Sequence, residues 1–72
     1  MGKPNDPVTN PVHYTQGKIE CLDVIEDQNF GFLDGCALKY LWRYRFKHTP
    51  IQDLKKCRFY IDRIISNLEK EV

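Results

Sequence analysis

The sequence has no long apolar run, and its three cysteines form neither an even set nor a close pair. A helix that spans a membrane needs ~18 or more consecutive apolar residues, so we predict no membrane partner. Small disulfide-rich secreted domains carry an even number of cysteines behind a signal peptide, and we find neither pattern here. We therefore expect a soluble, cytoplasmic chain. Its cysteines, Cys21, Cys36 and Cys57, fit small buried hydrophobes better than metal ligands or catalytic thiols.

An excess of one charge sign is also missing. The 11 Lys and Arg side chains oppose 10 Asp and Glu side chains, which gives a formal net charge of +1. Domains that bind nucleic acid through bulk attraction are usually strongly basic, so nucleic acid is not an expected partner. The phosphate-binding patterns GxxxxGK[ST] and GxGxxG do not occur. With 72 residues, the chain is also too short for a conventional kinase or hydrolase fold.

No segment alternates apolar and polar residues, which argues against a sheet. Helical spacing instead predicts helices over residues 19–28, over 33–47 and from residue 50 onward. We predict an all-α, three-helix domain over residues 13–72. An extended or disordered arm over 1–12 precedes it, since its three prolines lack backbone donors. A chain of this size buries too small a fraction of its surface to be comfortably stable alone, so we expect a homo-oligomer.

The segment 33–47 is predicted to form a helix with three different faces. One apolar stripe follows steps of three and four residues and contains Leu33, Cys36, Ala37, Tyr40, Leu41 and Tyr44. A narrower apolar stripe contains Leu38 and Trp42. Between the two runs a cationic row of Lys39, Arg43 and Lys47, with Arg45 beside it. We expect one face to meet its own chain, a second to meet another subunit, and the row to meet water, carboxylates or phosphate.

The flanking helices have simpler patterns. In the first, Ile19, Leu22 and either Val24 or Ile25 are expected to turn inward. The last should begin with Thr49 as N-cap and Pro50 at the first helical position, with Gln52 completing a capping box. Its apolar stripe is nearly unbroken and contains Leu54, Cys57, Ile61, Ile64, Ile65 and Leu68, with Arg58 as the interruption.

The cationic row and its aromatic neighbours are the strongest candidate site. Arginine and lysine bind phosphate oxygens, and an aromatic face stacks on a base, so Lys39, Arg43 and Trp42 together favour a nucleotide pocket. The alternative is that the aromatics are packing residues and the cations form a solvated face. His13 and Tyr14 could add a donor to a phosphate, or could lie on the surface or cap a helix.

Two carboxylates form a weaker candidate site. Glu20 and Asp23 lie one helical turn apart and could hold Mg²⁺. We favour the alternative, in which they face solvent or pair with Lys39 and Arg43, because exposed acids on a helix are common and surface pairs stabilise weakly. No metal site is therefore predicted.

Three segments carry a resemblance to a known family: NPVHYTQGKIECLDVIED, FLDGCALKYLWRYRFK and DLKKCRFYIDRII. The chain resembles, over about residues 10–66, a small family found mostly in bacteriophages and prophages, described as a domain of unknown function and often labelled nucleotide-kinase-like. The resemblance implies a phage protein in the cytoplasm of an infected or lysogenic bacterial host. Members commonly carry a glycine before a lysine where this chain has Tyr44, Arg45 and Phe46.

We expect a protein that binds, and sequesters, a nucleotide or a nucleotide-derived signal such as a host-defence messenger, at pockets between subunits. The predicted ligand-binding residues are His13, Tyr14, Lys18, Lys39, Trp42, Arg43, Arg45 and Lys47. Such binding requires no cofactor. One alternative is a nucleoside monophosphate kinase or related phosphotransferase without a phosphate-binding loop, which would need Mg²⁺. We rank it second because transfer requires two nucleotides held in line with a metal. The other is an adaptor that grips a protein through the Trp42 side of the helix.

Overall fold

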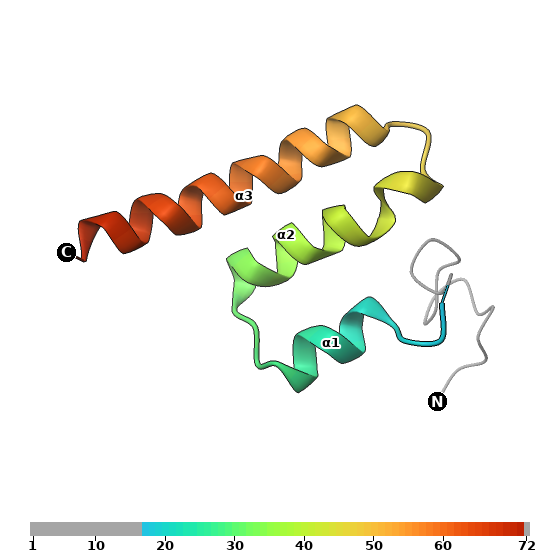
Figure 1. The fold of residues 1–72 in the computed structure, drawn as a ribbon, viewed down its shortest axis with the longest axis horizontal. Helices are drawn as coiled ribbons and strands as arrows, with labels where there is room; N and C mark the ends of the chain where they lie inside the picture. The colour runs from blue at the N-terminus through green and yellow to red at the C-terminus, as the bar shows by residue number, and fades with distance from the viewer. Residues whose placement is uncertain (1–16, 72) are drawn as a thin grey trace.

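The computed structural model describes residues 17–71, and these fold into three helices that succeed one another across short turns (Figure 1). The elements are α1 (Cys21–Asp27), α2 (Phe32–Arg43), the 3-10 turn η2 (Tyr44–Phe46) and α3 (Pro50–Lys70). No strand occurs within this part of the chain, so the predicted all-α, three-helix fold is confirmed. The predicted arm over residues 1–12 lies outside the described residues, as do His13 and Tyr14.

The central helix ends earlier than predicted. We expected it to reach Lys47, but α2 ends at Arg43 and the chain continues as η2. At Lys47 the backbone is extended, with φ −120° and ψ 167°. Lys47 therefore does not continue the row formed by Lys39 and Arg43, because the regular spacing of an α-helix no longer applies after η2.

The turn between α1 and α2 is a well-formed helix stop. Asn29 has a positive φ of 54°, a conformation that asparagine tolerates better than most residues. The amide of Asn29 donates to the carbonyl of Glu26 (3.2 Å) and that of Phe30 to the carbonyl of Ile25 (3.0 Å). These two bonds satisfy carbonyls at the end of α1 in the manner of a Schellman motif, and they turn the chain back toward α2.

The start of α3 is predicted correctly, but its cap is not. Thr49 is the N-cap and Pro50 occupies the first turn, as expected. Thr49 makes no side-chain capping hydrogen bond, however, and its φ of −126° and ψ of 60° depart from the usual extended cap. The capping box predicted from Thr49 and Gln52 is therefore not formed on the threonine side.

The buried core is small and made of small side chains. The buried apolar residues among residues 17–71 are Cys21, Ala37 and Cys57, and no large side chain there is fully buried. The thiol of Cys57 donates to the carbonyl of Ala37 across 3.2 Å, which joins α3 to α2. Cys21 and Cys57 thus fit the prediction of small buried hydrophobes, while Cys36 is half-buried.

α1 turns inward only part of the set of residues that was predicted. Ile19 and Leu22 are 62% and 60% exposed, so their predicted inward placement is wrong within the single chain. The same steps of three and four residues also fit Cys21, Val24 and Ile25, and these are buried or half-buried. Ile25 packs against Gly35 of α2, which is buried.

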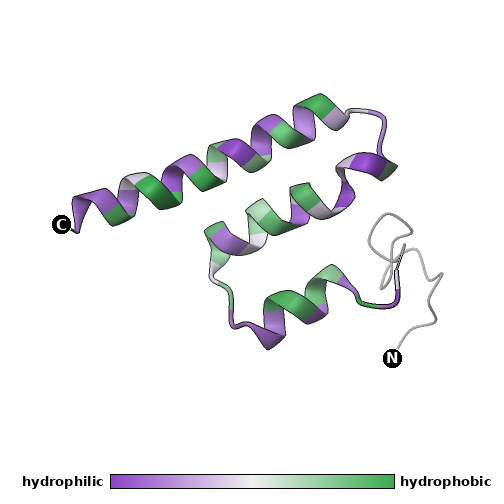
Figure 2. Cartoon of the chain, in the orientation of Figure 1, coloured by the Kyte–Doolittle hydropathy of each residue, from purple (hydrophilic) through white to green (hydrophobic). Residues whose placement is uncertain are grey.

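α3 is much longer than the helices it packs on. It runs antiparallel to α2, and its last turns project beyond the start of α2 (Figure 1). Apolar residues recur along the whole of α3, including this projecting part (Figure 2). Within residues 17–71, none of the helices combines the length and apolar character needed to cross a membrane.

Candidate functional site

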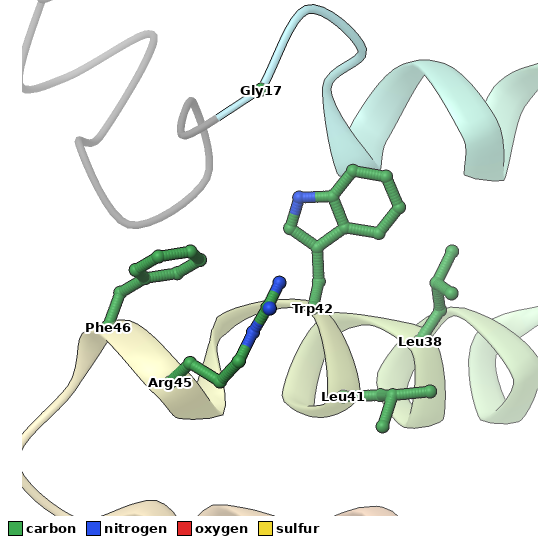
Figure 3. A pocket seen from close by; sticks show the side chains of 6 residues that line it. All are labelled: Gly17, Leu38, Leu41, Trp42, Arg45 and Phe46. Carbon is green, nitrogen blue, oxygen red and sulfur yellow. The ribbon is translucent and has the colours of Figure 1, made fainter.

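A cavity of about 420 Å³ opens beside Trp42 (Figure 3). α2 supplies three of its lining side chains, η2 supplies two, and the stretch before α1 supplies backbone. The lining residues are Gly17, Leu38, Leu41, Trp42, Arg45 and Phe46. We call this cavity the indole pocket.

The indole pocket combines two aromatic walls with one cation. The indole of Trp42 points from α2 toward the stretch that contains Gly17, and the guanidinium of Arg45 lies between the indole and the ring of Phe46 (Figure 3). The Arg45 Cζ is 5.3 Å from the centroid of Phe46, a cation–π distance. Trp42 and Arg45 are three residues apart, a spacing that puts them on the same side of an α-helix and of a 3-10 helix alike.

A second site is centred on Tyr40. Its ring stacks on Tyr60 of α3, with centroids 6.0 Å apart and planes at 10°. Three cations lie over the same ring: the centroid is 4.8 Å from Arg43 Cζ, 5.3 Å from Lys39 Nζ and 5.5 Å from Lys56 Nζ. Like charges held this close raise the local attraction for anions. We call Lys39, Arg43 and Lys56 the cation cluster.

The structure divides the predicted ligand residues between these two places. Trp42 and Arg45 line the indole pocket, whereas the exposed Lys18 follows the lining residue Gly17 but is not itself among the lining residues. Lys39 and Arg43 belong to the cation cluster instead, because Tyr40 and Trp42 are two residues apart and so point to different sides of α2. Lys47 is half-buried beyond η2.

Lys56 was missed by sequence reasoning. It is contributed by α3 and reaches Tyr40 only because α3 packs against α2. A signal did exist: Lys56 and Tyr60 are four residues apart on one helix and therefore share a face. The sequence did not show how α3 is positioned along α2, and it is this packing that brings the face with Lys56 to Tyr40.

The burial of Asp53 was also not predicted from the sequence. Asp53 carries a charge and yet is buried, with only 3% of its surface exposed. Its Oδ2 atom has no hydrogen-bond partner within residues 17–71. Asp53 lies in the first turn of α3, where the helix dipole favours a negative charge. This position explains its charge without requiring a ligand.

Glu20 and Asp23, the two carboxylates of the weaker candidate site, lie at the start of α1. Glu20 occupies the N-cap position, and Asp23 lies exposed in the first turn. Residues 17–71 contain no group of three or more His, Cys, Asp or Glu side chains placed to hold a metal ion. Carboxylates at a helix N-terminus are stabilised by its dipole, which accounts for the pair as it stands.

The buried cysteines are poorly suited to nucleophilic chemistry. Burial raises the pKa of the Cys21 and Cys57 thiols above their usual value, and the nearby Lys39 ammonium offsets part of this rise at Cys21. The thiolate is the reactive form, so a raised pKa makes both side chains less reactive at neutral pH. The pKa of Tyr60 is raised as well. The main cause is loss of water around its phenol, and its neighbours Cys36 and Tyr40 add to the rise.

Comparison with known proteins identifies a family but no function. Residues 8–62 match the model of a family described as a protein of unknown function (DUF3310). The match spans most of the chain, including the indole pocket and the cation cluster. No curated protein and no solved structure shows a significant similarity to the chain.

Proposed function

The chain belongs to the DUF3310 family of proteins of unknown function, and from its own side chains we propose that it binds a nucleotide without converting it. The indole pocket is the observation that carries this proposal. Its volume of about 420 Å³ lies in the range of ~300–1,000 Å³ typical of small-molecule sites. Stacking of a base on an aromatic side chain is worth ~1–3 kcal/mol, and Trp42, Phe46 and the Arg45 guanidinium all offer flat faces.

The phosphates would be held by the cation cluster. Charge-assisted hydrogen bonds to phosphate contribute ~1.5–3 kcal/mol each, and three cations converge on one ring here. Because this cluster and the indole pocket lie on different sides of α2, one nucleotide would engage both most simply between two copies of the chain. We accordingly place the proposed site at an inter-subunit pocket.

Binding fits the site better than phosphoryl transfer. Transfer requires two nucleotides in line, a metal ion and exclusion of water. The indole pocket is open and offers one base-sized space with one cation at its wall. We propose sequestration of a nucleotide or a nucleotide-derived signal as the role of the protein.

Calorimetry of the full chain against a panel of nucleoside mono-, di- and triphosphates and cyclic nucleotides tests the proposal. We expect at least one to bind, and Trp42→Ala and Arg43→Ala each to weaken that binding at least ~10-fold, as loss of one stacking or charged contact implies. Lys70→Ala, which removes an exposed cation at the far end of α3, is the matched control and should bind normally. Circular dichroism checks that each variant keeps its helicity.

Two results would contradict the proposal. A chain that gives no heat with any nucleotide would instead favour an adaptor that binds protein through the Trp42 side. If a nucleotide binds, mass spectrometry of the recovered ligand decides between binding and turnover. An unchanged nucleotide supports sequestration, whereas a gained phosphate supports a phosphotransferase.

A further inference from the structure

An exposed apolar strip follows α3 from its second turn to its end. The strip contains Leu54, Ile61, Ile65 and Leu68, which are 39% to 58% exposed and lie at steps of seven, four and three residues. At 100° per residue these four side chains fall within one narrow arc of the helix. Leu41 of α2, 51% exposed, lies close by, since it lines with Ile61 a groove of about 320 Å³ between α2 and α3.

Charged residues flank this strip, and the sign of their charge changes along the helix. Lys55 and Arg58 lie on the flank in the first half of α3. Asp62 and Glu69 lie on the same flank in the second half, and all four are exposed. One half of the flank is therefore cationic and the other half anionic, with the change of sign close to Ile61.

We propose that a second copy of this chain covers the strip, with the two α3 helices antiparallel about a two-fold axis near Ile61. In that arrangement Lys55 and Arg58 of one copy face the partner's Glu69 and the partner's Asp62, and the same pairs recur on the other side of the axis. A parallel two-fold pair would place this flank against the partner's opposite flank, so these four charges would not meet one another. The order of charges thus selects the antiparallel pair.

A copy of the same chain fits this surface better than an unrelated protein. A two-fold interface uses one patch on both partners, so the patch must be complementary to itself, and this flank is. The chain also buries no large side chain fully within residues 17–71, so covering the strip would supply the burial that a small fold needs. This inference does not depend on nucleotide binding.

Charge reversal tests the pairing. The variant K55E/R58E makes the whole flank anionic, and the variant D62K/E69K makes it cationic. We expect the unmodified chain to sediment as a dimer, and each variant alone to dissociate at least ~10-fold more readily, because like charges then face each other. An equimolar mixture should recover the dimer, since each anionic flank meets a cationic one. Lys70→Glu, a reversal on the opposite side of α3, is the matched control and should leave the dimer intact.

The mixture keeps the test decisive. If the separate variants lose helicity because the monomer is unstable, recovery of both helicity and dimer mass on mixing still supports the pairing. The proposal is overturned if the unmodified chain sediments as a monomer of 8.6 kDa at tens of micromolar, which would leave the strip to another partner. It is also overturned if the reversal variants dimerise as well as the unmodified chain does, or if mixing them restores nothing.

Discussion

At the scale of single residues, Gly35 of α2 lies where Ile25 of α1 contacts it. A methyl group built at Gly35 would lie 3.6 Å from the nearest atom of Ile25, which is an ordinary van der Waals contact. Glycine in a helix interior costs about 0.5–1 kcal/mol relative to alanine. We therefore expect Gly35→Ala to raise the free energy of unfolding by about that amount, as measured by urea denaturation.

Two further variants serve as controls for the prediction on Gly35→Ala. Gly31→Ala changes a glycine at the N-cap of α2, outside the helix interior, and should bring no such gain. Gly35→Leu fills the space taken by Ile25 and should lower the free energy of unfolding by about 1–3 kcal/mol. If Gly35→Ala instead loses stability, the space between Gly35 and Ile25 is too small for a methyl group, and the prediction is wrong.

The residue types of the site were predictable, but their grouping was predictable only in part. Trp42 and Arg45 were both expected to bind ligand from the chemistry of their side chains. That they line one pocket fits their spacing of three residues, which puts both on the same side of a helix. Lys56 reaches Tyr40 through the packing of α3 on α2, a tertiary contact that spacing along one helix does not encode.

At the scale of elements, the start of α3 offers a direct test of a local rule. Replacing a threonine N-cap by alanine typically costs ~1 kcal/mol, because the side chain satisfies a backbone amide. Thr49 makes no such hydrogen bond here. We therefore expect Thr49→Ala to lower the free energy of unfolding by less than about 0.5 kcal/mol, measured by thermal or urea denaturation.

Asp53→Asn provides the comparison for Thr49→Ala. It removes the negative charge of a buried side chain in the first turn of α3, where a charge–dipole interaction is worth about 0.3–1 kcal/mol or more. We expect the loss of stability in Asp53→Asn to exceed that in Thr49→Ala. A loss of 1 kcal/mol or more in Thr49→Ala would mean that the threonine does cap the helix in solution.

Helix existence followed from periodicity, whereas the buried face of α1 did not. Two sets of residues in α1 and the stretch before it satisfy helical spacing: Ile19 with Leu22, and Cys21 with Val24 and Ile25. We predicted Ile19 and Leu22 with either Val24 or Ile25, but α2 presents a glycine at the contact, and Ile25 lies against it while Ile19 and Leu22 are exposed. The choice between equivalent faces is made by the shape of the neighbouring helix, which the segment itself does not contain.

At the scale of the whole molecule, the indole pocket and the proposed dimer surface share side chains. Leu38 and Leu41 line both the indole pocket and the groove between α2 and α3. A partner that covers this groove would lie next to the bound base, so the two proposed binding events should affect each other. Coupling of this kind is reciprocal: whatever factor the nucleotide adds to dimerisation, dimerisation adds to nucleotide binding.

Sedimentation and calorimetry can measure this coupling from both sides. We expect a saturating nucleotide to lower the dimer dissociation constant by about 5-fold or more, in the range of typical couplings. The separate variants K55E/R58E and D62K/E69K should bind the same nucleotide correspondingly more weakly, and their mixture should recover full affinity. Equal affinity in monomer and dimer would show that one copy completes the indole pocket. The dimer would then serve only to cover the strip on α3, and the site would have to be sought within a single chain.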